Sequence, residues 1–159
     1  MAESTTLREL INAGSDKAVA IDGVDRPSLT YGEFRAHVDR TVATLNRIGI
    51  GRNDRVAIVL PNGPQMAVAF VSIAAGATTA PLNPAYKKEE YEFYLSDLGA
   101  RALLVEAGST SPAVESATKL DIPVLEISAG DDRPAGVFDI TPAAPMDASE
   151  PESAGMAEQ

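Results

Sequence analysis

Apolar residues recur along residues 29–105 at two spacings, and the spacing changes several times between helical and extended. Steps of three and four predict a helix over residues 31–48. Its apolar face consists of Tyr31, Phe34, Val38, Val42, Leu45 and Ile48. Thr30 and Glu33 have the spacing of a capping box, which predicts that the helix starts there. Gly49 can end the helix because glycine accepts a left-handed backbone without a steric penalty.

Strands and helices alternate after this first long helix. Residues 55–60 form a nearly continuous apolar run, which is typical of a strand buried on both faces of a parallel sheet. Further strands are predicted over residues 78–82 and 102–105, and further helices over residues 65–75 and 87–98. Short connections between alternating strands and helices favour right-handed crossovers. We therefore predict an α/β fold, with a mostly parallel sheet and helices on both faces.

The pattern is weaker on either side of this region. A short helix is predicted over residues 7–11 and a hairpin over residues 18–30. A weaker repeat predicts a helix over residues 112–120 and a strand over residues 123–127. One more short strand is predicted over residues 136–140.

These elements predict one α/β subdomain over residues 1–141, with its core at residues 16–106 and the weaker repeat at residues 107–141. Residues 142–159 are rich in proline, alanine, serine and acidic residues and have no periodic apolar pattern. Such a segment buries too little apolar surface to offset its ordering entropy. We predict an acidic linker or frayed tail there.

Charge is unevenly distributed along the 159 residues, which carry a net charge of −10. The net charge is −2 over residues 1–106 and −8 over residues 107–159. Neither part offers the basic face that nucleic-acid binding needs, so that class of function is excluded. We interpret the acidic part as solvated, with an interaction arm as the alternative.

The chain has no cysteine, which excludes disulfides, thiolate nucleophiles and cysteine zinc sites. The N-terminus has no basic region followed by an apolar run, so no signal peptide is expected. The longest apolar stretch, residues 66–75, is shorter than the about 20 residues that a membrane-spanning helix needs. We therefore predict a cytoplasmic protein without a membrane span.

The loops that follow the predicted strands carry no recognised catalytic motif. They lie at residues 61–64, 83–86 and 107–111, and none contains G-x-G-x-x-G or G-x-x-x-x-G-K-[ST]. The sequence has no G-x-S-x-G nucleophile elbow either. Gly49 and Gly51 precede a strand, whereas a dinucleotide-binding loop follows one, so we interpret them as a helix stop and a turn.

Four further candidates are also interpreted structurally. The segment Gly108-Ser109-Thr110-Ser111 lacks the lysine of a phosphate loop and is predicted to be a polar turn. His37 has no partner at ligand spacing and is predicted to be a structural histidine, at the surface or half-buried. Asp131-Asp132 is predicted to be a solvated pair, because Ca²⁺ takes 6–8 oxygen ligands. Residues 86–90 could be a docking patch, but we interpret them as the first turn and solvent face of a helix.

The sequences of four segments resemble motifs of the adenylate-forming enzymes. This family includes acyl-CoA synthetases, aryl-CoA ligases, luciferases and peptide-synthetase adenylation domains. Residues 29–34, LTYGEF, are similar to the family's LTYxEL element. Residues 49–62, GIGRNDRVAIVLPN, resemble its entry into the first core strand, and residues 74–86, AAGATTAPLNPAY, resemble its second core motif. Residues 89–105 resemble the helix and strand that follow. The sequences of these motifs resemble those of acyl-CoA synthetases, including oxalate–CoA ligase-like and fatty-acyl-CoA ligase-like members, more closely than those of peptide synthetases.

The resemblance implies a partial N-terminal subdomain of such an enzyme. Family members are several times longer, and their phosphate loop ending in Pro-Lys follows the region present here. The resemblance implies ATP, Mg²⁺ and CoA as cofactors of the parent enzyme and none for this fragment. No catalytic, cofactor-binding or metal-binding residue can be assigned to it.

The leading hypothesis is therefore an inactive scaffold fragment of an AMP-forming acyl-CoA synthetase. The alternative is a non-enzymatic interaction or regulatory module with the same fold, and a free-standing nucleotide-binding domain is a third hypothesis. The expected partner is the remainder of the parent enzyme. A homodimer is also expected, because an incomplete sheet leaves apolar surface or a strand edge uncovered.

Overall fold

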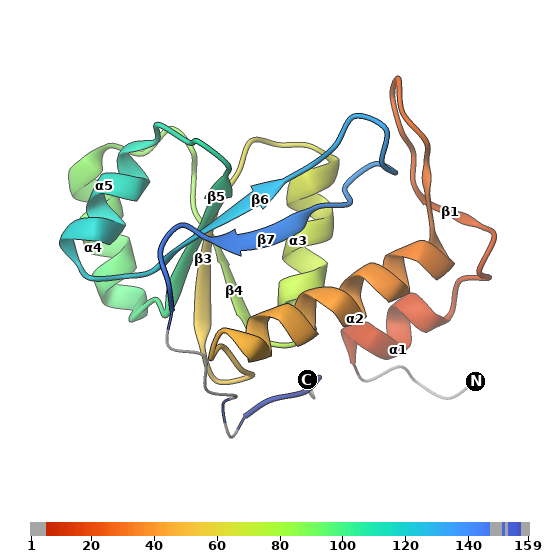
Figure 1. The fold of residues 1–159 in the computed structure, drawn as a ribbon, viewed down its shortest axis with the longest axis horizontal. Helices are drawn as coiled ribbons and strands as arrows, with labels where there is room; N and C mark the ends of the chain where they lie inside the picture. Colours follow the sequence, from red (N-terminus) through yellow and green to blue (C-terminus); the bar gives the residue numbers. More distant parts are fainter. Residues whose placement is uncertain (1–5, 147–150, 152, 157–159) are drawn as a thin grey trace.

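The computed structural model describes residues 6–146, 151 and 153–156. Within these residues the chain forms helices on both sides of a main sheet, together with a separate two-stranded sheet near the N-terminus (Figure 1). The helices are α1 (Leu7–Asn12), α2 (Tyr31–Arg47), α3 (Pro64–Ala74), α4 (Lys88–Leu98) and α5 (Pro112–Lys119). The strands are β1 (Val19–Ile21), β2 (Leu29–Thr30), β3 (Arg55–Val59), β4 (Thr78–Pro81), β5 (Ala102–Glu106), β6 (Val124–Ser128) and β7 (Asp139–Pro142).

Helix α2 begins where its sequence predicts and ends one residue earlier, at Arg47. The Glu33 N–H donates to Thr30 Oγ1 at 3.3 Å, and the Thr30 N–H donates to Glu33 Oε2 at 3.0 Å. These hydrogen bonds to Thr30 hold the pKa of the Glu33 carboxyl below its usual value. Gly49 follows the helix with φ of 81°, the left-handed backbone expected at a helix stop.

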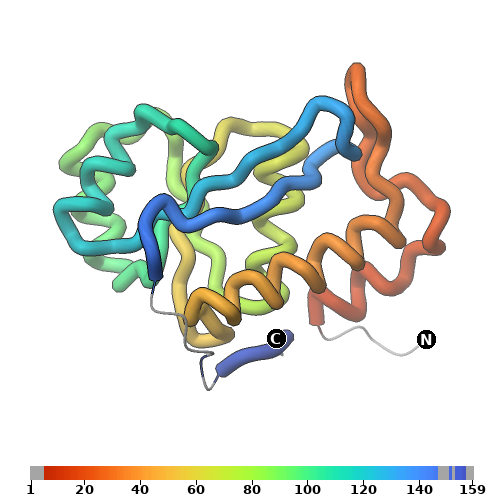
Figure 2. Tube along the Cα trace, in the orientation of Figure 1, coloured from red at the N-terminus to blue at the C-terminus, as the bar shows by residue number. Residues whose placement is uncertain are grey.

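The main sheet has the strand order β4-β3-β5-β6-β7. The first four strands are parallel, and β7 runs antiparallel beside β6. The tube view shows the chain passing from each parallel strand to the next in sequence through α3, α4 and α5, and the α4 crossover passes over β3 (Figure 2). The predicted mostly parallel sheet is confirmed.

Each face of the sheet has its own apolar core. Ile58 and Leu104 lie in the core formed with α2 and α3. Leu103 points to the opposite face and packs with Tyr91 and Leu95 of α4. Neighbouring residues of a strand point to opposite faces, so β3 and β5 divide the two cores. Figure 1 shows α4 and α5 on one side of the sheet and α2 and α3 on the other, which confirms that both faces are covered.

The last strand differs from its prediction. It was expected over residues 136–140, but β7 comprises Asp139–Pro142. Gly136 has a left-handed backbone with φ of 85°, and the Ala135 N–H donates to Pro27 O at 2.8 Å. Residues 135–138 therefore form a buried turn fastened to the N-terminal hairpin, and their apolar pattern reflects packing rather than strand pairing.

Part of the expected tail contacts the body of the protein. Met146 and Met156 pack against the larger core, and the Arg52 N–H donates to Ser153 O at 3.0 Å. Residues 147–150, 152 and 157–159 of the predicted tail lie outside the described residues. The division at residue 141 stays a prediction. Among the described residues, no helix has the length and apolar character to cross a lipid bilayer.

Candidate functional site

The carboxyl ends of the parallel strands meet at one edge of the sheet. Ligands of open α/β sheets usually bind at this edge, where the strand order reverses. Here the order reverses between β3 and β5, because the chain passes from β3 outward to β4 and then returns to the other side of β3. The loops at residues 60–63 and 107–111 follow these two strands.

The polar groups of the loop after β5 are used within the fold. Ser111 Oγ accepts a hydrogen bond from the Ala113 N–H at 3.2 Å and thereby caps α5. Ser109 Oγ accepts from the Ser111 N–H at 3.2 Å, and the Gly108 N–H donates to Glu126 Oε1 at 3.1 Å. The predicted polar turn at residues 108–111 is confirmed.

The segment at residues 86–90 begins α4 and ties it to neighbouring elements. The Lys87 N–H donates to Glu90 Oε2 at 2.8 Å, and Lys88 Nζ forms an ion pair with Glu115 of α5. This ion pair raises the pKa of Lys88. The ring of Tyr86 stacks on that of Tyr94, with a centroid separation of 5.1 Å. The interpretation as a helix start is therefore confirmed.

A small cavity of about 420 Å³ lies at the carboxyl ends of β5 and β6 and is lined in part by Arg26, Glu106 and Ser128. Arg26 Nη2 lies 3.6 Å from Oδ1 of Asp131, whose side chain is fully exposed. Asp131 and Asp132 are therefore solvated, as predicted. In the part of the chain that the structure describes, no group of three or more His, Cys, Asp or Glu residues could hold a metal ion.

His37 is buried more deeply than its sequence position predicts. Only 2% of the residue is exposed, so the expectation of a surface or half-buried histidine was wrong. The turn before β7 covers it, and the Phe138 ring meets the imidazole edge to face at 4.5 Å between centroids. Burial, followed by the nearby charges of Arg40 and Arg133, lowers the pKa of His37 to about 4. The imidazole is therefore neutral at physiological pH.

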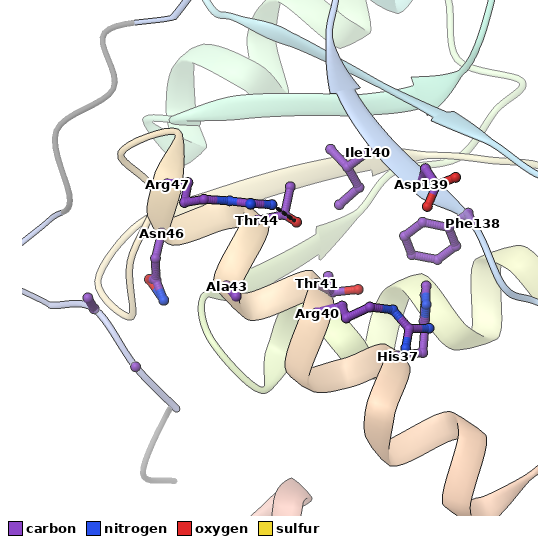
Figure 3. A pocket seen from close by; sticks show the side chains of 12 residues that line it. His37, Arg40, Thr41, Ala43, Thr44, Asn46, Arg47, Phe138, Asp139 and Ile140 are labelled. Carbon is purple, nitrogen blue, oxygen red and sulfur yellow. Dashed lines mark hydrogen bonds between the residues drawn. The ribbon is translucent and has the colours of Figure 1, made fainter.

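A hollow with a volume of about 1030 Å³ adjoins His37 and extends between α2 and β7. Figure 3 shows Arg40, Thr41, Thr44 and Arg47 of α2 on one side and Phe138, Asp139 and Ile140 on the other. We call this hollow the α2–β7 groove. The sequence predicted none of these residues as a site. To predict the groove from the sequence, one would need to know that Arg40 and Asp139 line the same hollow, although they lie about a hundred positions apart in the chain.

Comparison with known proteins assigns this fold to a family. The sequence pattern of the AMP-binding enzyme family matches residues 7–156. The chain is 38% identical to oxalate–CoA ligase of Arabidopsis thaliana, over 67% of this chain and 21% of that protein. It is 34% identical to 4-coumarate–CoA ligase 3 of Oryza sativa subsp. japonica, over 67% of this chain and 20% of that protein. The chain thus spans about a fifth of the length of these curated relatives.

Solved structures agree with the fold. Apo MatB from Rhodopseudomonas palustris superposes with a TM-score of 0.66 at 19% identity, covering 79% of this chain and 26% of that chain. At this identity the likeness shows the α/β fold alone. The resemblance inferred from the four sequence segments is confirmed by the family match and the curated relatives. The chain belongs to the AMP-binding enzyme family and corresponds to an N-terminal portion of an adenylate-forming enzyme.

Proposed function

We propose that this chain is the N-terminal scaffold portion of an AMP-forming acyl-CoA synthetase. The parent reaction joins a carboxylate to ATP, giving an acyl-adenylate and pyrophosphate, and then transfers the acyl group to CoA with release of AMP. The observation that carries the proposal is the family match over residues 7–156. The curated CoA ligases that cover two thirds of the chain support the choice of CoA as acceptor.

The contribution of this portion to the parent enzyme is structural. The polar groups of its carboxyl-edge loop at residues 108–111 cap α5 and bind Glu126, so they are not arranged to receive a triphosphate. In the parent, ATP and Mg²⁺ would be held by residues outside this portion. A cytoplasmic location stays a prediction, and so does the role in fatty acid metabolism that a fatty-acyl-CoA ligase-like parent would imply.

The purified chain is expected to catalyse no carboxylate-dependent ATP–pyrophosphate exchange above a protein-free blank. Label exchange between pyrophosphate and ATP measures the first half-reaction directly, with full-length oxalate–CoA ligase of Arabidopsis thaliana as the positive control. Exchange by this chain that grows with its concentration would contradict the scaffold role. A chimera with residues 7–156 in place of the matching segment of that ligase tests the family role separately. The chimera should form acyl-CoA.

The chain is also proposed to associate with itself. Large apolar side chains stand exposed on several elements, including Leu10 at 59%, Val24 at 86% and Phe93 at 63%. Exposed apolar surface and open sheet edges favour pairing with another chain. Light scattering over a dilution series should give a mass above that of the monomer, and the excess should fall as the chain is diluted. A monomer mass at every concentration would count against association.

A further inference from the structure

The α2–β7 groove carries buried polar atoms that lack partners among the described residues. Both ring nitrogens of His37 and Oδ1 of Asn46 are buried and make no hydrogen bond. His37 is 2% exposed and Asn46 is 9% exposed, and both residues line the groove. A neutral imidazole has one donor and one acceptor, and the Asn46 oxygen is an acceptor. A molecule that satisfied them would therefore need both hydrogen-bond donors and acceptors, which a polypeptide backbone supplies as its N–H and C=O groups.

The groove is also positively charged. Arg40 and Arg47 line it, and neither forms an ion pair within the described ranges 6–146, 151 and 153–156. Arg133 and Asp139 lie nearby and neutralise each other, with Arg133 Nη1 2.7 Å from Asp139 Oδ2. Among the described residues, two arginines without an ion-pair partner therefore line the groove, in a chain whose net charge is −10. Negatively charged groups would be attracted to this site.

The edge of β7 supplies backbone groups to the same groove. In the described structure β7 pairs on one side with β6. The Ala143 N–H donates to Val124 O at 2.9 Å, so the N–H groups of Thr141 and Asp139 also face β6. Backbone groups alternate in direction along a strand, and the N–H and C=O of Ile140 therefore point away from β6. The backbone of Pro142, two residues further along the strand, also points away from β6, which fits its lack of an N–H to donate to that strand.

We propose that the α2–β7 groove is a docking site for an extended polypeptide segment with acidic side chains. The segment would add a strand beside Ile140, its carboxylates would meet Arg40 and Arg47, and a backbone N–H would reach the Asn46 oxygen. Strand addition of this kind takes affinity from main-chain hydrogen bonds and specificity from side-chain contacts. A small anion such as phosphate satisfies the arginines but offers little to an acceptor. The proposal goes beyond the scaffold role and does not depend on it.

The test uses the 159-residue chain, labelled with ¹⁵N, and a short acetylated peptide of alternating threonine and glutamate. We expect saturable shifts of the Ile140 amide and of α2 amides near Arg40 and Arg47, with binding weakened at high salt. Three comparison probes are the same peptide with lysine for glutamate, the glutamate peptide N-methylated at alternate residues, and inorganic phosphate. The lysine and N-methylated peptides should bind at least about tenfold more weakly, a difference of about 1.4 kcal/mol.

Substituted variants of the chain show where on its surface the peptide binds. The double variant Arg40→Glu/Arg47→Glu should lose about tenfold or more in peptide affinity. Arg101→Glu makes one such charge reversal in a different hollow and should bind like the original chain. Thermal unfolding confirms that each variant is folded, and the peptide comparisons leave the protein unchanged.

Four outcomes would overturn the proposal. The first is no shift at Ile140 up to millimolar peptide, and the second is equal binding of the lysine or N-methylated peptide. The third is phosphate producing the same shifts with the same affinity, which would make the groove a simple anion site. The fourth is self-association that moves the same amides in the absence of peptide, which would make a second copy the occupant.

Discussion

Replacing His37 by leucine is expected to remove a large part of the protein's sensitivity to acid. In the folded chain the pKa of His37 is lowered from 6.5 to about 4, chiefly by burial. Above about pH 6.5 this histidine is neutral in both the folded and the unfolded state, so its depressed pKa costs no stability there. As the pH falls from about 6.5 towards about 4, the unfolded state takes up a proton that the folded state does not. Stability therefore falls across this range, by about 3 kcal/mol in total.

The measurement is the free energy of unfolding by urea at pH 7 and at pH 4.5, for the original chain and for His37→Leu. The original chain should lose about 2 kcal/mol more than the variant between these two values. At pH 7 the variant should be at least as stable, because leucine removes two buried ring nitrogens without partners. Equal losses in both proteins would show that the burial of His37 does not control the response to acid.

Replacing Leu104 by alanine is expected to lower the free energy of unfolding by about 3–4 kcal/mol. Leu104 lies in the central strand β5, is fully buried and belongs to the larger core with Ile58 and Val42. Strands β3 and β6 flank it, so the surrounding backbone is held by hydrogen bonds on both sides and can collapse little into a cavity. A loss of this size is a large share of the 5–15 kcal/mol that is typical of a whole domain.

The matched control is Leu10→Ala, the same chemical change at a side chain that is 59% exposed in α1. It should alter the free energy of unfolding by no more than about 0.5 kcal/mol. Urea denaturation of both variants at pH 7 provides the comparison. Similar losses at the two positions would contradict the placement of Leu104 at the centre of a packed core.

Local signals were sufficient to predict most of the elements. The apolar face of α2 and the capping pair Thr30 and Glu33 involve residues within one helix, so they can be recognised without knowledge of the fold. The buried strand β3 was predicted because both of its faces are apolar. Strand β7 was misplaced by three residues at its start, because Val137 and Phe138 are apolar for packing against α2 and α3 rather than for strand pairing.

The groove and the burial of His37 could not be predicted in this way. His37 is covered by Phe138, and Arg40 lines the same groove as Asp139, so each pairing joins residues about a hundred positions apart. Periodicity reports which face of a helix is apolar, but not what later packs beside that face. The structural interpretation of the loops at residues 86–90 and 108–111 succeeded for the opposite reason, since much of their bonding is local.

The division of the two cores by β5 has a consequence for the fidelity of folding. Residues 102–105 are buried on both faces, so sliding the strand by one position would still place apolar side chains in both cores. A strand with one polar face resists such a slip, but an apolar pattern on both faces does not. The correct alignment must therefore be enforced from the two ends. Gly99, with a left-handed φ of 58°, fixes the entry, and the bond from the Ala107 N–H to Ile127 O at 2.9 Å fixes the exit.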